Sequence, residues 1–223
     1  MFTFRRLTIE DLPLILDMQQ EIYESLHPDI FQRSTAEFIS YCLGDGGHVH
    51  SAYHDDTIVG YRIVYIPRER EFNLSKDIPL ARQEQVRVAH FDTVAVLPRW
   101  RGFSLSRALN EQALSALRET DIRHLFATSS PRNPYGLRQL MAVGFRSVRL
   151  GVKFGGKMRV LSYRPFPEDM APAAADLGER SIPLTATTNL DVAFRTGWVG
   201  VGVETSGTDS LMRLRYQPAP FDC

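Results

Sequence analysis

The stretch that decides the fold spans residues 92–109 and reads DTVAVLPRWRGFSLSRAL. Residues 86–96 give a strong strand signal, and the stretch begins inside them. Apolar residues recur at helical spacing over 104–119, which predicts a helix there. Between the two lies a basic, glycine-containing loop. The sequence therefore predicts a strand that runs through this loop directly into the start of a helix.

Such a loop has the properties of an anion site. The first N–H groups of a helix lack intrahelical partners, and the helix dipole adds positive potential at the same end. Together they suit a pyrophosphate group. Gly102 lets a phosphate approach the backbone, and Arg99 and Arg101 supply charge. On these grounds alone, an ordinary connection with exposed arginines explains the residues equally well.

Outward from this stretch, the pattern mixes hairpin-linked strands with crossover helices. Further strands are expected at 2–6, 48–53, 58–66, 124–128, 145–153 and 158–163. Capping signals at 8–11 and 34–37 predict two early helices, and a later one opens at Asn133 and closes at Gly144. This order predicts an α/β fold with a mixed, α+β type of sheet. The polar segment 67–85 is long enough to be a lid or substrate loop.

The composition changes after residue 163. Residues 164–183 hold four prolines and an alanine run, which is typical of a linker or extended arm. Strands are expected at 191–205 and 211–217. We therefore expect a domain at 1–163, followed by a linker and β-rich extension at 164–223 that packs on the core and covers one face.

Composition excludes several classes of function. The 223 residues carry 26 basic and 26 acidic side chains, and this zero net charge argues against nucleic acid or anionic membrane as partner. No apolar run approaches the ~18 residues of a membrane span, and the N-terminus lacks a signal-peptide core. Cys42 and Cys223 are too few for a disulfide framework. His48 and His50 share a strand face without a convincing third ligand, so no metal site is expected. The default location is cytoplasmic.

Three elements in order carry a family resemblance: Val96-Leu97-Pro98 leading into residues 99–104 (RWRGFS), Asn133 opening a helix, and Gly144-Phe145 closing it. Over residues 2–163 the chain resembles the GNAT superfamily of acyl-CoA-dependent N-acyltransferases. The resemblance implies the GNAT fold, here with a C-terminal β-rich extension.

The resemblance also implies a co-substrate, acetyl-CoA or another acyl-CoA, held where the fourth and fifth strands splay apart. Backbone groups of Val94 and Val96 would hold the pantetheine arm, and Asn133 would lie near the thioester. Arg99 would add charge to the phosphate site. Backbone N–H groups would cradle the pyrophosphate, from Arg101, Gly102, Phe103, Ser104 and Leu105.

The implied reaction is acetyl transfer to a primary amine of a small molecule, by direct attack on the thioester. It needs a proton acceptor, and His90 and Asp92 lie on one face of the fourth strand. An ordinary histidine pKa near 6.5 suits a base. Alternatively, His90 is hydrogen-bonded within the sheet. Asp92 either orients His90, receives the substrate ammonium, caps a turn or pairs with an arginine.

The chain departs from the family pattern at two positions. Ser104 replaces a glycine or alanine in the loop, and Leu140 stands where a general-acid tyrosine is frequent. Tyr135 is the candidate substitute. These departures leave two alternatives: an acyltransferase using a longer acyl-CoA or acyl carrier protein, and a non-catalytic acyl-CoA-binding module.

The sequence says less about the acceptor substrate and about the oligomeric state. Asp77 and Glu84 either attract a cationic amine or belong to a solvated loop. Pairing of the tail with a second protomer would give a homodimer.

Overall fold

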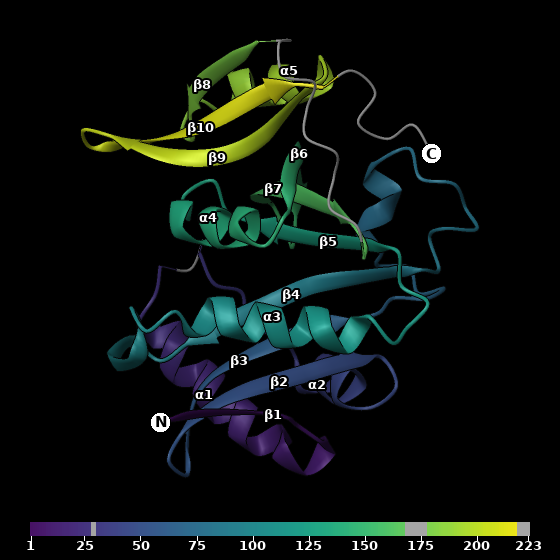
Figure 1. The fold of residues 1–223 in the computed structure, drawn as a ribbon, viewed down its shortest axis with the longest axis vertical. Coiled ribbons are helices and arrows are strands. Elements are labelled where there is room, and N and C mark those ends of the chain that lie inside the picture. Colours follow the sequence, from purple (N-terminus) through teal and green to yellow (C-terminus); the bar gives the residue numbers. More distant parts are fainter. Residues whose placement is uncertain (28–29, 168–177, 218–223) are drawn as a thin grey trace.

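The computed structural model describes residues 1–27, 30–167 and 178–217. Within these ranges ten strands form one mixed sheet, in the order β1-β2-β3-β4-β5-β7-β6-β9-β10-β8 (Figure 1). The strands are β1 Phe2–Arg6, β2 Gly47–His54, β3 Thr57–Tyr65, β4 Val88–Val96, β5 His124–Ser129, β6 Arg146–Lys153, β7 Lys157–Pro165, β8 Glu179–Pro183, β9 Trp198–Ser206 and β10 Asp209–Tyr216. The helices are α1 Leu12–Glu24, α2 Ala36–Leu43, α3 Leu105–Leu117, α4 Pro134–Ala142 and α5 Thr187–Arg195, with short 3₁₀ turns η1 Ile9–Asp11, η2 Leu74–Asp77 and η3 Pro98–Trp100. No helix in the described ranges is long and apolar enough to cross a membrane.

Capping residues set the starts of several helices where the sequence predicted them. Thr8 begins η1, which leads into α1, and a proline lies in the first turn of α1. The Thr35 side chain accepts a hydrogen bond from the Phe38 N–H at 3.2 Å, and the Asn133 side chain accepts one from the Gly136 N–H at 2.9 Å. Each side chain satisfies a backbone donor that the helix itself leaves unpaired.

The helices pack on both faces of the sheet. On one face, Ile15 of α1 and Ile39 of α2 lie in a core with Tyr61 of β3. On the other, α3 and α4 cover β4 and β5, with Leu140 packed in the same core as Phe91. The two layers follow from the alternation of side chains along β3 and β4, which buries residues on both faces.

Two irregularities of β4 create the space for a site. First, β4 runs parallel to β5 only over three registered pairs, which end at His90 and Phe126, and the strands then diverge. Second, the register against β3 shifts, because Val64 pairs with Phe91 whereas Arg62 pairs with Val94. One extra residue therefore bulges from β4 between these pairs, and such bulges redirect side chains.

The C-terminal extension continues the sheet beyond β6, and Figure 1 shows it at the end opposite β1. The β6–β9 pairing rests on Ser147 and Gly200. A Cβ on Gly200 would lie 2.8 Å from the Cβ of Ser147 on β6, so the close approach of the two strands favours glycine there. Leu190 and Phe194 share a buried core with residues of the preceding domain, namely Leu137, Leu150 and Val160.

The predicted secondary structure of this extension is partly wrong. A strand was expected to begin at residue 191, but residues 187–195 form α5 and the strand β9 begins at Trp198. Leu190, Ala193 and Phe194 are buried at helical spacing, which explains the helix. The expected linker includes β8 at its end, and residues 168–177 of it lie outside the described residues.

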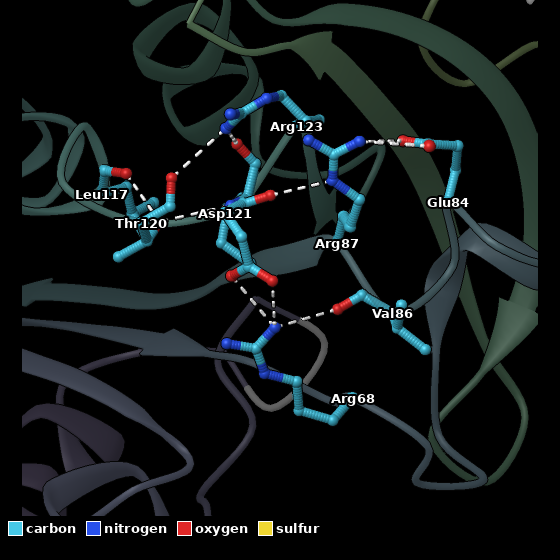
Figure 2. A network of polar contacts seen from close by, with 9 residues as sticks. Arg68, Glu84, Val86, Arg87, Leu117, Thr120, Asp121 and Arg123 are labelled. Carbon is cyan, nitrogen blue, oxygen red and sulfur yellow. Dashed lines mark hydrogen bonds and ion pairs between the residues drawn. The ribbon is translucent and has the colours of Figure 1, made fainter.

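Hydrogen bonds and an ion pair anchor the long segment between β3 and β4 near the starts of β4 and β5 (Figure 2). Arg68 donates to both carboxylate oxygens of Asp121 at 3.1 and 2.9 Å, and to the Val86 carbonyl at 3.2 Å. Arg87 donates to the Asp121 carbonyl at 3.1 Å and forms an ion pair with Glu84 at 3.2 Å. The network connects this segment to the turn between α3 and β5.

Candidate active site

A cavity of about 540 Å³ lies where β4 and β5 diverge. It draws lining residues from both faces of the sheet, including Phe38 of α2 on one side and Leu140 of α4 on the other. Its floor is the bulged part of β4, residues 91–94. A second hollow of about 670 Å³ lies over the polar segment at residues 68–86, and none of its lining residues borders the cavity. The cavity at the splay is therefore the candidate site.

Asp92 is the carboxylate that lines this cavity, and it is half-buried in the bulge. Burial raises the pKa of Asp92 to about 6, and the positive charge of Arg62 opposes that rise. A carboxyl with this pKa is mostly ionised at neutral pH and can still exchange a proton there.

Arg62 is a buried arginine in the middle of β3, 1% exposed. Its Nε and Nη2 both donate to Oδ1 of Asn110 on α3, at 2.9 and 2.6 Å, and its guanidinium lies 4.5 Å from the centroid of the Phe91 ring. Burial lowers the pKa of Arg62 to about 9. The side chain is fixed, so it places a constant positive charge beside the cavity.

His90 lies on β4 next to the cavity but outside its lining, with 2% of its surface exposed. Its Nε2 accepts a hydrogen bond from the Leu74 N–H at 3.1 Å, which requires a neutral ring with the proton on Nδ1. Tyr65, Phe72 and Phe126 surround the ring. Burial lowers the pKa of His90 to about 3. His90 is therefore a buried strand histidine that is hydrogen-bonded to η2, outside the sheet.

The residues predicted around the thioester divide between the cavity and the surface. Asn133 and Leu140 both line the cavity, and Asn133 does so while it caps α4. Tyr135 is 54% exposed and does not border the cavity. Several side chains with hydroxyl groups do border it, three of them at the end of β5 and the residue after it, Thr128, Ser129 and Ser130, and the others at Ser34, Thr35 and Thr93.

The predicted phosphate loop is exposed and strained in the manner of an anion site. Gly102 has φ +90°, and a Cβ there would meet nothing within 4 Å. Ser104, the cap of α3, has φ +58°, a left-handed conformation that a non-glycine residue adopts at a cost. Phe103 is 57% exposed. Backbone turned in this way before a helix presents consecutive N–H groups outward.

The loop arginines are docked on α1 and the sheet. Arg99 forms an ion pair with Glu21 at 3.1 Å. The Arg101 side chain donates to the Val96 carbonyl at 3.3 Å and to Ser25 Oγ at 3.4 Å, while its backbone N–H donates to the Pro98 carbonyl at 3.2 Å. Arg101 therefore lies against the same strand edge as Val96, and its N–H closes η3.

Three segments meet over the end of the cavity that faces α1 and α2. Lys157 Nζ, at the β6–β7 hairpin, donates to Gln32 Oε1 in the α1–α2 connection at 2.5 Å. Phe72 and Phe154 pack with ring centroids 5.7 Å apart, which joins the segment after β3 to the same hairpin. We call these contacts the roof.

Asp77 and Glu84, for which the sequence left open attraction of an amine or a place in a solvated loop, both lie outside the cavity. Asp77 pairs with Lys153 at 2.7 Å, and Glu84 pairs with both Arg87 and His124. Neither borders the cavity.

Sequence reasoning missed several lining residues. Arg62 could have been identified from the sequence. It is a lone arginine within the apolar run 58–66, and burial of its charge costs free energy unless the side chain has a partner or a role. The missed aromatic and cationic lining comes from separate segments whose meeting the sequence does not display, namely Phe31, Arg33, Phe38, Phe72, Phe154 and Arg159.

Comparisons with known proteins agree with this geometry. Solved structures of similar fold include the ribosomal-protein-S18-alanine N-acetyltransferase from Escherichia coli, with 15% identity and TM-score 0.57 over 80% of this chain and 99% of that one. The putative acetyltransferase yncA from Salmonella typhimurium, with its cofactor acetyl-CoA, has 18% identity and TM-score 0.57 over 78% and 99%. Arabidopsis thaliana NAA60 in complex with acetyl-CoA has 16% identity and TM-score 0.59 over 75% and 100%.

No curated protein sequence matches this chain. A family model does, the acetyltransferase (GNAT) family, over residues 12–145. The match covers more than half of the chain and includes the loop at 99–104, Asn133 and Gly144-Phe145. The chain therefore belongs to the acetyltransferase (GNAT) family, whose enzymes use an acyl-CoA as co-substrate.

Proposed function

We propose that this acetyltransferase transfers the acetyl group of acetyl-CoA to a primary amine of a small molecule. The observation that carries the proposal is the cavity of about 540 Å³ that Asp92 lines, bordered by segments that the roof contacts join to one another. A small amine fits within this volume, and the roof contacts narrow the space available to a bulkier acceptor such as a protein N-terminus.

The cofactor loop and strand edge fit an acyl-CoA. The N–H groups of Gly102, Phe103, Ser104 and Leu105 would hold the pyrophosphate, with charge from Arg99 and Arg101. The exposed edge of β4 at Val94 and Val96 would hold the pantetheine arm, after the shift of Arg101 away from the Val96 carbonyl. Asn133 would then lie beside the thioester at the splay.

In the reaction, the substrate ammonium first gives one proton to Asp92, because Asp92 is the ionisable carboxylate of the cavity. The neutral amine nitrogen then attacks the thioester carbonyl carbon, the C–N bond forms, the C–S bond breaks and CoA leaves as its thiolate. The second proton of the nitrogen passes to that thiolate or to water. We assign His90 a positioning role, since its Nε2 holds the backbone of Leu74 beneath the roof residue Phe72. Leu140 offers no proton, so the thiolate leaves without a tyrosine acid.

The test is a panel of acceptors incubated with acetyl-CoA, with CoA release and product mass as readouts. Small primary amines should be acetylated, and peptides with the same terminal group should react at least tenfold more slowly. Faster reaction of peptides would overturn the small-molecule proposal. Acetyl-CoA that binds but is never consumed would support the non-catalytic module instead.

A further inference from the structure

Aromatic side chains from separate parts of the chain gather along the cavity. Phe31 lies in the α1–α2 connection, Phe38 in α2, Phe72 in the β3–β4 segment and Phe154 in the turn between β6 and β7. We call these four phenylalanines the aromatic wall. Each of them borders the cavity, so the fold brings four apolar rings to one space.

Ring contacts join three of the four phenylalanines into one surface. Phe38 and Phe72 both pack on Tyr65 of β3, at 5.1 and 6.2 Å between ring centroids. Phe72 in turn packs on Phe154 at 5.7 Å. The Tyr65 hydroxyl also donates to the Phe72 carbonyl at 3.3 Å, which holds the backbone of this segment in place. The aromatic wall is therefore a continuous apolar surface with a fixed shape.

The aromatic wall lies beside the cavity carboxylate. Phe72 and Tyr65 pack on the His90 ring, at 5.6 and 5.2 Å between ring centroids. His90 precedes Asp92 by two residues on β4, and Asp92 lines the same cavity as the aromatic wall. An amine whose ammonium meets Asp92 can therefore rest its remaining atoms on these rings.

Two rings of the aromatic wall are left accessible to solvent. Phe72 is 41% exposed and Phe154 is 38% exposed. In the described ranges the other exposed phenylalanine is Phe103, in the phosphate loop. Accessible apolar surface beside a cavity gains free energy when a ligand covers it, and aromatic rings gain further from a second ring. The two rings are therefore suited to bind an apolar ring.

The backbone at Phe154 supports a role for its ring. Phe154 has φ +50°, a left-handed conformation that favours glycine and that a bulky residue adopts at a cost in free energy. The next two residues in the turn are glycines, yet position 154 holds a phenylalanine that borders the cavity. Such strained residues gather at ligand-binding sites, where the strain places a side chain.

We propose that the acceptor is a primary amine on a short arm that carries an apolar ring, and that this ring packs on the aromatic wall. The inference rests on the proposed function and narrows its substrate class. The ammonium faces Asp92, while the ring covers the exposed parts of Phe72 and Phe154. A short or polar amine leaves these two rings in contact with water and binds more weakly.

The first test uses the unaltered protein and three primary amines: 2-phenylethylamine, ethanolamine and glucosamine. Ethanolamine lacks the ring, and glucosamine carries a polar ring of similar size. With CoA release as the readout, kcat/KM for 2-phenylethylamine should exceed that for each other amine by about 10-fold or more, the effect of burying one apolar ring. Equal or faster reaction of ethanolamine or glucosamine would overturn the inference and leave the proposed function standing. No CoA release with these amines or with the wider amine panel would overturn both.

The second test removes one ring without straining the turn. Phe154→Gly should change Tm little, because glycine is favoured at this φ. It should lower kcat/KM for 2-phenylethylamine about 5-fold or more and change that for ethanolamine by less than twofold.

Met158→Ala is the matched control. Met158 lies in the same hairpin and is also 38% exposed, but it does not border the cavity. This variant should keep the ratio of the two kcat/KM values within twofold of the unaltered enzyme. A Phe154→Gly enzyme that keeps this ratio, or that loses activity equally with both amines, would show that the ring does not bind the acceptor and would contradict the inference.

Discussion

Lys157 and Gln32 are 125 positions apart in the sequence, yet Lys157 Nζ donates to Gln32 Oε1 at 2.5 Å. This bond holds the β6–β7 hairpin against the α1–α2 connection, and both segments border the cavity through Phe154 and Gln32. This part of the cavity is therefore assembled by long-range contacts of segments outside the sheet.

Gln32→Ala should loosen the roof. The bond is exposed and contributes about 0.5–1.5 kcal/mol, so we expect kcat/KM for a small amine to fall about 2- to 12-fold while acetyl-CoA affinity is unchanged. Steady-state kinetics together with titration of acetyl-CoA would measure this. Arg107→Ala is the control, since it breaks an exposed ion pair with Glu111 on α3. If both variants lose the same activity, the roof has no role in acceptor binding.

Asp92→Asn should lower kcat by about 100- to 10,000-fold, the usual contribution of a positioned proton acceptor. In the unaltered enzyme kcat/KM should rise with pH through about 6, as Asp92 loses its proton, and the variant should lack this rise. The pH dependence of kcat/KM is the measurement. Asp77→Asn, which alters a carboxylate paired with Lys153, should keep the profile. A profile in Asp92→Asn that matches the unaltered enzyme would assign the base elsewhere.

Acid should destabilise the fold before it protonates most carboxyl groups. Burial lowers the pKa of His50 to about 4 and that of His90 to about 3, both below the ordinary 6.5. Below pH 6.5 the unfolded chain therefore binds protons that the folded chain resists. As the pH falls, each histidine lowers the free energy of unfolding by about 1.4 kcal/mol per pH unit until its pKa in the folded state is reached. Below about pH 6 the folded chain also takes up a proton at Asp92, and this offsets the loss from one of the two histidines.

Denaturant titrations at pH 7.5, 6 and 5 would measure this loss. His50→Gln should make the dependence shallower. Stability that is constant between pH 7.5 and 5 would contradict the account of both buried histidines.

The extension should be part of the folding unit. Leu190 is fully buried in the core that it shares with Leu150 and Val160, so Leu190→Ala should cost about 2–5 kcal/mol. Val192 on the same helix is 55% exposed, and Val192→Ala should cost less than about 0.5 kcal/mol. Removal of residues 164–223 should likewise lower Tm. An unchanged Tm after truncation would show that the domain at 1–163 does not depend on the extension.

Local sequence was sufficient for the fold and the family. The loop at 99–104, Asn133 and Gly144-Phe145 are short-range patterns, and the family, the mixed sheet and the acyltransferase class that they predicted are confirmed. The prediction of a strand from residue 191 was wrong because the run there contains valine and alanine and also suits a strand. In the structure it forms α5, which buries Leu190 and Phe194 at helical spacing.

The site was harder to predict because its chemistry depends on distant neighbours. An ordinary histidine pKa would suit His90 as a base. In the fold, Leu74 and three aromatic rings enclose the ring, and burial lowers its pKa. Burial at the β4 bulge raises the pKa of Asp92, and Arg62 on the neighbouring strand opposes that rise. Arg159 on β7 borders the cavity, and periodicity alone cannot place it there.

The measurement that tests the central claim most directly is calorimetric titration of acetyl-CoA into three proteins: unaltered, Gly102→Val and Gly207→Val. Gly102 at φ +90° forms the phosphate loop, and Gly207 at φ +59° forms the β9–β10 turn, so both substitutions strain similar backbone. We predict binding to the unaltered protein and to Gly207→Val, with affinity at least tenfold weaker in Gly102→Val. Equal affinity in all three, or no binding to the unaltered protein, would contradict an acyl-CoA site at the start of α3.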